Sequence, residues 1–552
     1  MPVQISAVRQ APLIAAEPFL RIPPFPGSKV GRFSIQDPEG LGPEAEIADL
    51  LRDLKVGGTF WAAQPKMPTR YFLVRTTAPL DRCIEIPGDV PLVRWLRTAT
   101  PTAANEARLV VTGDCDPWHV FGGAAGVILD ADDPLGLIPT LLNIPAYVRD
   151  ATTGELQVRE PQLKTELEAA LLCGTYVSPF TGEGMSVREA IELCGFWRQL
   201  IDKNRELGGG LGFAFWKQDN VGALMWGGSA PFQFLRTASE IRGGDAPIAV
   251  WRSKVSAAEL AELEGQGRPL VEVEDGFLRS RGLGADCVPP LSITVDGAGA
   301  YFDPSSPSEL EALLQDGAFD EQLISRARRL RQLIVEAGLS KYSRGGVQLN
   351  RRCDGRRHIL VPGQVEDDRA VQTGGCGLTS NLDLLIRVRE HAPDAYILYK
   401  PHPDVVAGHR KGAIPDRTCL QYADEIAPEA PVSSLIAMVD EVHVNTSLAG
   451  FEALMREKQV AAYGVPFYAG WGLTRDLGPV PARRTARRTL DELVAATLLL
   501  YPRYLDPETG LPCPPEVVVA RLGGENVPDT NMVVTMRRLQ GKLMRSVRSL
   551  VQ

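Results

Sequence analysis

The chain has 552 residues, 44% of them hydrophobic and 23% charged, which is enough to bury several cores in about three or four domains. Its net charge of -9 at pH 7 argues against a general nucleic-acid-binding protein, which normally has a basic surface. The nine cysteines include no CxxC pair, which suits a reducing cytoplasm and argues against a structural zinc site. We expect no signal peptide, because the N-terminus has no continuous apolar core of the required length, and no membrane span, because no apolar run reaches about 18 residues.

Residues 1–175 are predicted to be a truncated α/β remnant of a first module. The segment RLVVTGDCDPWHVFGGAAGVILDADDPLGLIPTLLNIPAYV reads as two strand-like runs with a helix between them. An internal repeat supports this interpretation, because LLCGTYVSPFTG (171–182) matches LLYPRYLDPETG (499–510) at six of twelve positions. The repeat offset far exceeds that of a solenoid, so the same module ending is expected to occur twice.

Residues 176–510 alternate short apolar strands with helices, the pattern of parallel α/β domains. Capping boxes at Ser186, Ser308 and Thr489 mark helix starts, because each hydroxyl is followed three residues later by a glutamate. The polar segment NRRCDGRR separates two such units. We therefore assign 176–350 and 351–510 to two lobes.

A helical tail is predicted over 511–552, and its last part is basic and amphipathic. Residues 531–552 contain no acid, and apolar side chains recur there at helical spacing. Such a helix can lie on an anionic membrane, where each basic residue contributes about 1 kcal/mol. The alternative is a helix packed on its own domain with a solvated basic face. The basic residues are Arg537, Arg538, Lys542, Arg545 and Arg548.

Polar side chains follow several of the predicted strands, where open α/β sheets bind their ligands. In NTSLAGFEAL, hydroxyls and free N–H groups at a helix start can hold a phosphate, although ordinary N-capping gives the same pattern. In KPHPDV, two prolines fix the backbone around His402, and Lys400 supplies a nearby charge. That histidine can bind a phosphate or assist a leaving group, or it is structural.

Acidic residues follow two further strands. Three consecutive acids, Glu366, Asp367 and Asp368, come directly after HILVPGQV, where a solvated loop is the simpler interpretation. The segment EDGFLRSRGLG carries two acids and two arginines that can bind an acidic sugar, since arginine binds carboxylates bidentately, or can form a salt-bridged turn. Trp471, in GWGL, can stack on a sugar ring or serve in packing.

Several of these motifs together resemble the capsule polysaccharide β-Kdo transferases of the KpsC type. The matching segments include VEDGFLRSRGLGAD, ILVPGQVEDD, YILYKPHPDVVAGHRKG, VHVNTSLAGFEAL and GVPFYAGWGLTRD, within about residues 175–510. Members of that family usually carry two tandem transferase modules, and this sequence resembles the second. The resemblance implies an α/β fold with a GT-B-like pair of Rossmann-like lobes and an active-site cleft between them.

The resemblance also implies an activity, which is retaining transfer of β-Kdo from CMP-Kdo to a Kdo-bearing, phosphatidylglycerol-type lipid in capsule polysaccharide biosynthesis and transport. Carried onto this chain, Asp368 is the nucleophile with Glu366 as the competing choice, and Glu274 is the acid/base. Two such carboxylates suit retention by double displacement. The residues implied to hold CMP are Lys400, His402, Asn445, Thr446, Ser447 and Glu452. Those implied to bind the sugars are Gln364, Asp275, Arg279, Arg281 and Trp471.

The family further implies a cytoplasmic protein that is peripheral on the inner face of the cytoplasmic membrane. Its expected partners are the CMP-sugar donor, the lipid-linked Kdo acceptor, the inner-membrane surface and other capsule synthesis or export proteins, with no nucleic acid. Neither a metal nor another cofactor is expected. The first 170 residues lack equivalents of the family motifs, so we expect that part to be catalytically inactive.

Three alternatives remain open from the sequence. One is a transferase that uses another nucleotide-activated sugar, and another is a non-catalytic capsule assembly protein. The third is a hydrolase dependent on Mg²⁺ or Mn²⁺, which favour oxygen ligands. Its metal would be held by Glu366, Asp367, Asp368, His402 and His443.

Overall fold

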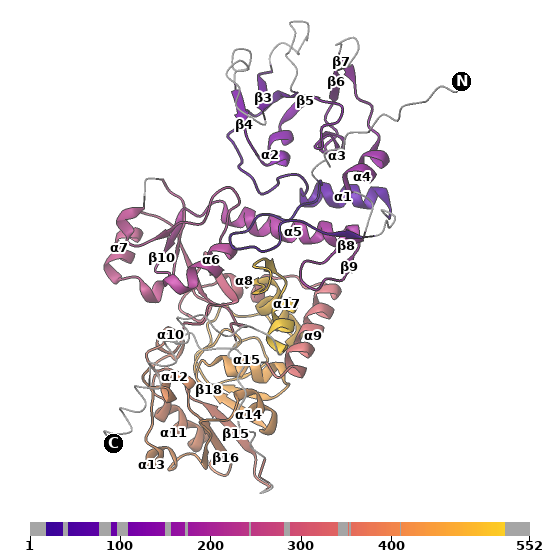
Figure 1. Ribbon diagram of the computed structural model, residues 1–552. Coiled ribbons are helices and arrows are strands. Elements are labelled where there is room, and N and C mark those ends of the chain that lie inside the picture. The colour runs from indigo at the N-terminus through magenta and orange to yellow at the C-terminus, as the bar shows by residue number, and fades with distance from the viewer. Residues whose placement is uncertain are drawn as a thin grey trace, which may run out of the picture. The chain divides into compact units, whose positions relative to one another are not determined.

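The computed structural model contains both helices and strands, which confirms the predicted mixed α/β class (Figure 1). The chain divides into two compact units. Unit 1 comprises Met1–Arg205 and Trp226–Pro231, and unit 2 comprises Glu206–Met225 and Phe232–Gln552. The structure describes residues 18–36, 42–76, 90–96, 109–149, 156–171, 175–241, 244–280, 287–339, 351–352, 355–408 and 410–524. The predicted basic helix at 531–552 and Arg281 lie outside these residues.

Unit 1 contains a six-stranded sheet with the order β4-β3-β2-β5-β6-β7. All neighbouring strands are parallel except the last pair. The order reverses between β2 and β5, as in doubly wound sheets. With six strands, this sheet has more strands than the two predicted from the sequence. The strands are β2 (Tyr71–Arg75), β3 (Leu92–Leu96), β4 (Leu109–Thr112), β5 (Ala124–Leu129), β6 (Ala146–Arg149) and β7 (Leu156–Val158).

Unit 1 also contains five described α-helices, two of which start at clear caps. Asp116 caps α2, because its Oδ1 accepts a hydrogen bond from the Trp118 N–H at 3.1 Å. Ser186 and Glu189 form the predicted capping box of α5. The helices are α1 (Glu44–Leu54), α2 (Pro117–Gly122), α3 (Leu137–Leu141), α4 (Leu163–Leu171) and α5 (Val187–Asn204).

The internal repeat is confirmed as a repeated hairpin followed by a helix. In each copy the hairpin strands are antiparallel, and the helix begins five residues after the repeat's last glycine. The first copy is β8 (Thr175–Val177), β9 (Gly184–Met185) and α5; the second is β21 (Arg503–Leu505), β22 (Pro512–Cys513) and α17 (Pro515–Gly523).

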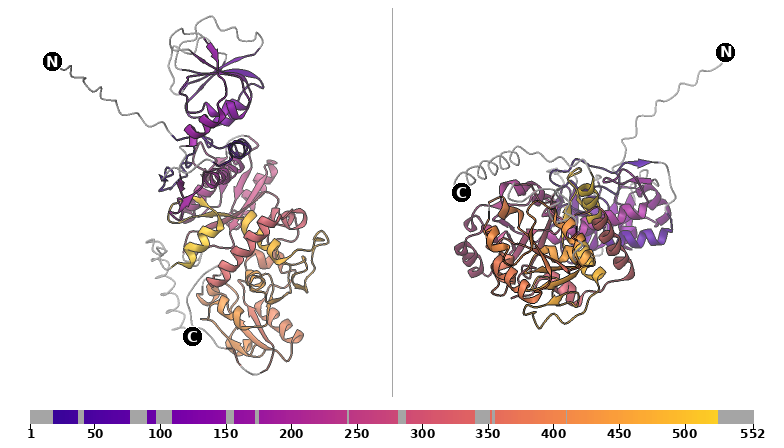
Figure 2. Two further views of the ribbon diagram at one scale, coloured as in Figure 1. Left: turned by 90° about the vertical axis from the view of Figure 1, so that its right-hand side faces the viewer. Right: turned by 90° about the horizontal axis from the view of Figure 1, so that it is seen from below.

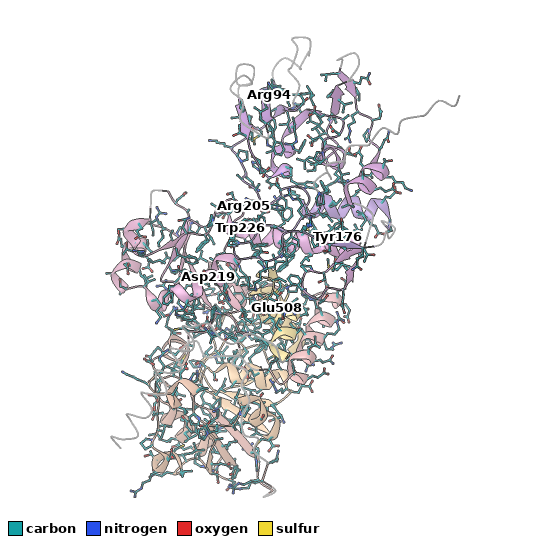
Figure 3. All side chains as sticks on the ribbon, in the orientation of Figure 1. Arg94, Tyr176, Arg205, Asp219, Trp226 and Glu508 are labelled. Carbon is teal, nitrogen blue, oxygen red and sulfur yellow. The ribbon has the colours of Figure 1, made fainter. Side chains whose placement is uncertain are left out.

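The two copies share details that the repeated residues explain. The hydroxyl of Tyr176, labelled in Figure 3, donates to a backbone carbonyl at 2.8 Å, and that of Tyr504 does the same at 2.9 Å. Gly182 and Gly510 both turn the hairpin with positive φ, +73° and +72°, which glycine adopts without strain. Because α5 completes the first copy, residues 176–205 lie in unit 1, whereas the sequence division places them in the second lobe.

Unit 1 also includes a short segment from later in the chain. Asn204 Nδ2 donates to the Trp226 carbonyl at 3.1 Å, and Arg205 donates to the Gly227 carbonyl at 3.3 Å. Arg205 and Trp226 are both labelled in Figure 3. A Cβ on Gly228 would lie 1.9 Å from the Trp61 carbonyl oxygen, so only glycine fits there. The segment Trp226–Pro231 therefore packs as part of unit 1.

A buried ion pair joins α5 to the start of α2, and breaking it should destabilise unit 1. Arg198 Nη2 lies 2.7 Å from Asp116 Oδ2, and the Asp116 side chain is fully buried. Arg198→Ala leaves that carboxylate without its cation, so we expect a loss of about 3–5 kcal/mol in the free energy of unfolding. Urea unfolding followed by tryptophan fluorescence measures it. Arg188→Ala, which breaks half-exposed pairs on the same helix, is the control and should cost less than about 1 kcal/mol.

Unit 2 contains two sheets, of which the first has the order β11-β10-β12-β13-β14-β21-β22. Its first four strands are parallel, and the remaining pairs are antiparallel. The yellow segment with β21, β22 and α17 lies against the pink strands of this sheet (Figure 2), although it comes last in the described chain. The other strands are β10 (Gly209–Leu211), β11 (Phe234–Leu235), β12 (Ile248–Val250), β13 (Leu270–Asp275) and β14 (Ser292–Asp296).

The second sheet of unit 2 is wholly parallel, with the order β17-β16-β15-β18-β19-β20. Its order reverses between β15 and β18, and its central strands are buried on both faces. Near-continuous apolar runs such as HILV and AYILY follow from that burial. The strands are β15 (His358–Pro362), β16 (Tyr396–Lys400), β17 (Glu425–Ile426), β18 (Glu441–Val444), β19 (Gln459–Ala462) and β20 (Arg475–Asp476).

Helices surround this second sheet and connect its strands. The core between them holds Ile359, Val361, Leu385 and Ile397, all fully buried. No helix in the described part of the chain is long and apolar enough to cross a membrane. The helices that matter for the site are α10 (Arg369–Gly374), α11 (Asn381–His391), α12 (Pro403–Val406) and α15 (Leu448–Met455).

Candidate active site

A cleft of about 940 Å³ lies in unit 2, lined by residues that follow strands of both its sheets. Residues at the carboxyl ends of the strands, where we expect ligands to bind, therefore lie in one cleft. The predicted site residues that line it are Glu274, Asp275, Arg279, Gln364, Asp368, Lys400, His402, Thr446, Ser447 and Glu452. Glu366, Asn445 and Trp471 do not line it.

The three consecutive acids have three different environments. Asp368 lines the cleft and caps α10, where its Oδ1 accepts a hydrogen bond from the Ala370 N–H at 3.0 Å. Its other oxygen, Oδ2, has no hydrogen-bond partner among the described residues. Asp367 is paired with Arg410 at 3.2 Å. The Glu366 carboxylate accepts from the Asn381 N–H at 2.8 Å, at the start of α11.

Glu274 lies at the end of β13 and lines the cleft. Burial raises the pKa of its carboxyl to about 7, and the nearby Arg369 guanidinium partly offsets that rise. Arg369 Nη1 lies 3.1 Å from Glu274 Oε1 and 3.0 Å from Glu272 Oε2. Because Arg369 directly follows Asp368, the first turn of α10 connects the two candidate catalytic carboxylates. Arg369 was not predicted as a site residue, and its position next to the acid run was the available signal.

Asp275 is held between two cations. Lys217 Nζ lies 3.0 Å from its Oδ1, and Arg279 Nε lies 2.8 Å from its Oδ2. Arg279 is fully buried and also donates to the Val288 carbonyl at 2.9 Å. Arg279 therefore has the contacts expected of a salt-bridged turn, which was the alternative to sugar binding. Lys217, also missed from the sequence, is buried, and that burial lowers the pKa of its ammonium group.

The ends of β15 and β18 are joined by a reciprocal pair of hydrogen bonds. Gln364 Nε2 donates to Thr446 Oγ1 at 2.9 Å, and the Thr446 N–H donates to Gln364 Oε1 at 2.9 Å. Ser447 caps α15 by accepting from the Ala449 N–H at 3.2 Å. The first N–H groups of this eight-residue helix and the two hydroxyls thus border the cleft, an arrangement that suits a phosphate. Asn445 lies behind them and donates to the Leu378 carbonyl at 2.6 Å.

His402 and Lys400 lie at the end of β16, where both line the cleft. His402 caps α12, because its Nδ1 accepts a hydrogen bond from the Asp404 N–H at 3.1 Å. In the neutral ring the proton is therefore on Nε2, which makes Nε2 a donor. Lys400 Nζ donates to the Pro428 carbonyl at 2.5 Å.

Two aromatic candidates from the sequence lie away from the cleft. Trp471 is fully buried, its indole N–H donates to the Phe467 carbonyl at 2.8 Å, and it therefore serves in packing. His443 is buried between the Tyr463 hydroxyl at 3.2 Å and the Glu441 carboxylate at 3.0 Å. Over the described residues, no group of three or more histidine, cysteine, aspartate or glutamate side chains could hold a metal ion.

Comparison with known proteins places these residues in a family context. The model of the family described as "Capsule polysaccharide biosynthesis protein" matches residues 248–352 and 347–504. The solved β-Kdo 2,4-transferase KpsC of Thermosulfurimonas dismutans is 33% identical, with a TM-score of 0.51, over 57% of this chain and 98% of that one. The chain belongs to the KpsC-type capsule polysaccharide protein family.

Two curated proteins are also similar to this KpsC-type chain. The capsule polysaccharide modification protein LipA of Neisseria meningitidis is 41% identical over 64% of this chain and 51% of its own. The lipopolysaccharide-processing protein LpsZ of Rhizobium meliloti is 48% identical over 43% of this chain and 54% of its own. The chain thus spans about half the length of the curated relatives it matches. The residues that the family model matches lie in unit 2 and include both candidate carboxylates, Glu274 and Asp368.

Proposed function

We propose that this chain is a retaining glycosyltransferase that moves β-Kdo from CMP-Kdo to a Kdo-bearing glycolipid in capsule polysaccharide biosynthesis. The main support is the pairing of Asp368 and Glu274 in one cleft, connected through Arg369. Under this proposal the two sheets of unit 2 are the Rossmann-like lobes of a GT-B-like enzyme. The Kdo-transferase relative supports the choice of sugar.

The first step is attack on the donor by Asp368. Its Oδ1 is fixed by the Ala370 N–H, so Oδ2 is the oxygen that attacks the anomeric carbon. The new carbon–oxygen bond forms as the bond to the CMP phosphate breaks, and CMP leaves with that electron pair. Lys400, His402 Nε2 and the start of α15 stabilise the departing phosphate charge. The product is a Kdo ester of Asp368.

The second step is attack by the acceptor hydroxyl on the same carbon, from the face opposite Asp368. Glu274 takes the hydroxyl proton, and the Asp368 carboxylate leaves. Two successive inversions retain the β-configuration of the donor. A pKa of about 7 suits Glu274 to this role, because a general base works best when its pKa is close to the working pH.

The remaining properties of the enzyme follow from these substrates. The acceptor is lipid-linked, so we propose that the protein works at the inner face of the cytoplasmic membrane, beside other capsule synthesis and export proteins. Phosphate charge is met by Lys400 and by hydrogen-bond donors, so no metal is required. Unit 1 is proposed to be catalytically inactive. There Arg75 is paired with Asp133 at 2.9 Å beside the switch point between β2 and β5.

The proposal is tested by incubating the purified chain with CMP-Kdo and a Kdo-primed lipid. We expect CMP release and a product one Kdo heavier by mass spectrometry, with a β-linkage by nuclear magnetic resonance. Denatured enzyme quenched with donor alone should carry a Kdo adduct in the 364–368 region. Turnover of another nucleotide sugar with CMP-Kdo left intact would show that the donor is that other sugar. Complete loss of activity with EDTA would favour a metal-dependent reaction.

A further inference from the structure

Three neighbouring strand ends form one wall of the cleft. Strands β10, β12 and β13 are adjacent and parallel, so their carboxyl ends meet at one edge of the first sheet. Trp216 follows β10, Lys254 follows β12, and Glu274 is the second-last residue of β13; all three line the cleft. The proposed base therefore has an aromatic ring and an ammonium group along the same edge.

The loop that carries Trp216 is firmly anchored. The neighbouring Lys217 ammonium lies 3.3 Å from the centroid of the Trp251 ring and 3.0 Å from Asp275 Oδ1. Gly212, with φ at +85°, lets the loops after β10 and β12 approach closely, because a Cβ there would lie 2.8 Å from the Trp251 carbonyl oxygen. These contacts fix the backbone on which Trp216 stands.

The cations along this edge differ in whether they form ion pairs. Lys217 shares the Asp275 carboxylate with Arg279, and Arg252 is paired with Glu272 at 2.7 Å and with Glu264 at 3.6 Å. Lys254 is exposed, and its ammonium has no ion pair with any described residue. Among the described residues of this edge, its ammonium is therefore a positive charge without a partner, which attracts an anionic group.

We propose that Trp216 and Lys254 form the subsite that binds the acceptor's terminal sugar, and that this sugar carries a carboxylate. The indole ring packs against the apolar face of the sugar ring, and the ammonium pairs with the carboxylate. This subsite rests on the proposed function, because it assigns Glu274, on the same edge, to the acceptor hydroxyl. The donor's phosphate, by contrast, is bound at the strand ends of the second sheet.

Kinetics with two acceptors test the subsite. The first acceptor is a soluble β-linked Kdo disaccharide, and the second is the same disaccharide with its terminal carboxylate converted to an amide. Lys254→Ala should raise the KM for the first acceptor about tenfold or more. It should leave the KM for the amide, the kcat and the KM for CMP-Kdo unchanged. Trp216→Ala should raise the KM for both acceptors.

Matched variants separate these effects from general damage. Phe215 is 70% exposed on the same turn but does not line the cleft, so Phe215→Ala should behave as wild type. Lys254→Arg keeps the charge and should restore most of the affinity. An unchanged acceptor KM in Lys254→Ala, or an equal loss with the amide, would overturn the role of Lys254. A rise confined to the KM for CMP-Kdo would show that both residues bind the donor instead of the acceptor.

A binding measurement distinguishes failure of the subsite from failure of the proposed function. Calorimetry with the Kdo disaccharide alone needs no turnover. If wild type binds it and Lys254→Ala binds at least about tenfold more weakly, the subsite stands even where CMP-Kdo is not consumed. If the two proteins bind it equally, or neither binds it, the subsite is wrong even where transfer occurs.

Discussion

Asp368→Asn should abolish Kdo transfer while leaving the fold intact. Asparagine keeps the oxygen that accepts from the Ala370 N–H, and it caps helices as well as aspartate does, so α10 should persist. It lacks the anionic oxygen that would form the ester with the anomeric carbon. We expect kcat to fall at least about 10³-fold, as it does when other enzymes lose their nucleophile. Steady-state CMP release measures the loss, and the donor adduct should disappear with it.

The neighbouring acids provide controls with nearly the same charge change. Asp367 is paired with Arg410 and does not line the cleft, so Asp367→Asn should retain most of the activity. Glu366→Gln keeps an oxygen for the Asn381 N–H and should also remain active. Loss of transfer in Glu366→Gln together with survival in Asp368→Asn would assign the nucleophile to Glu366 instead.

Glu274→Gln should slow transfer by about 10² to 10⁴-fold, the usual contribution of a general base. The donor adduct should still form, because the first step does not use Glu274. Adduct should therefore accumulate in this variant when acceptor is present, and rapid-quench mass spectrometry detects it. A variant that transfers at the wild-type rate would exclude Glu274 as the base.

The pH dependence of the wild-type enzyme should report the same carboxyl. A base must be ionised, so kcat/KM for the acceptor should fall as pH drops below about 7, the raised pKa of Glu274. Arg369 lowers that pKa, so Arg369→Gln should move the acidic limb to higher pH. Asp275 and Glu272 raise it and Lys217 lowers it, and they remain in that variant. A limb that stays in place would show that another group controls it.

Stability gives a readout of Glu274 that needs no substrate. Its carboxyl has a pKa of 4.5 in the unfolded chain and of about 7 in the folded protein, so the folded protein binds more protons between these values. Its contribution to stability therefore falls as pH rises from about 4.5 to 7. Glu274→Gln removes this contribution, so the stability of the variant relative to wild type should rise across the same range in urea unfolding.

The architecture could be predicted in part from the sequence. Alternating strands and helices identified the α/β class, and the short repeat corresponds to a hairpin and helix that occur twice in the structure. Strands β2 and β3 were missed because YFLVR and LVRWL are short apolar runs, each with one arginine, and such runs do not distinguish strand from helix. The capping box at Ser186 marked the start of α5, but only packing contacts reveal which unit that helix completes.

The residues of the candidate site could likewise be predicted only in part. Asp368, Glu274 and His402 were identified because each follows an apolar run, and strand ends converge in a parallel sheet. Lys217 and Arg369 could not be identified because their roles depend on neighbours far away in the sequence. Lys217 lies under Trp251 only because β10 pairs with β12. Trp471 follows a strand as well, yet sequence position does not tell whether a ring faces a cleft or a core.

The segment Trp226–Pro231 affects how the chain is made and how it can be divided. Unit 1 needs this segment for its contacts with Asn204, Arg205 and Trp61, but the ribosome produces β10 and α6 (Gln218–Leu224) of unit 2 before it. Unit 1 therefore cannot finish folding before synthesis of unit 2 has begun. For the same reason, no single cut in the gene yields either unit whole, and a fragment that begins at Glu206 would include Trp226–Pro231 without the unit 1 residues that this segment contacts.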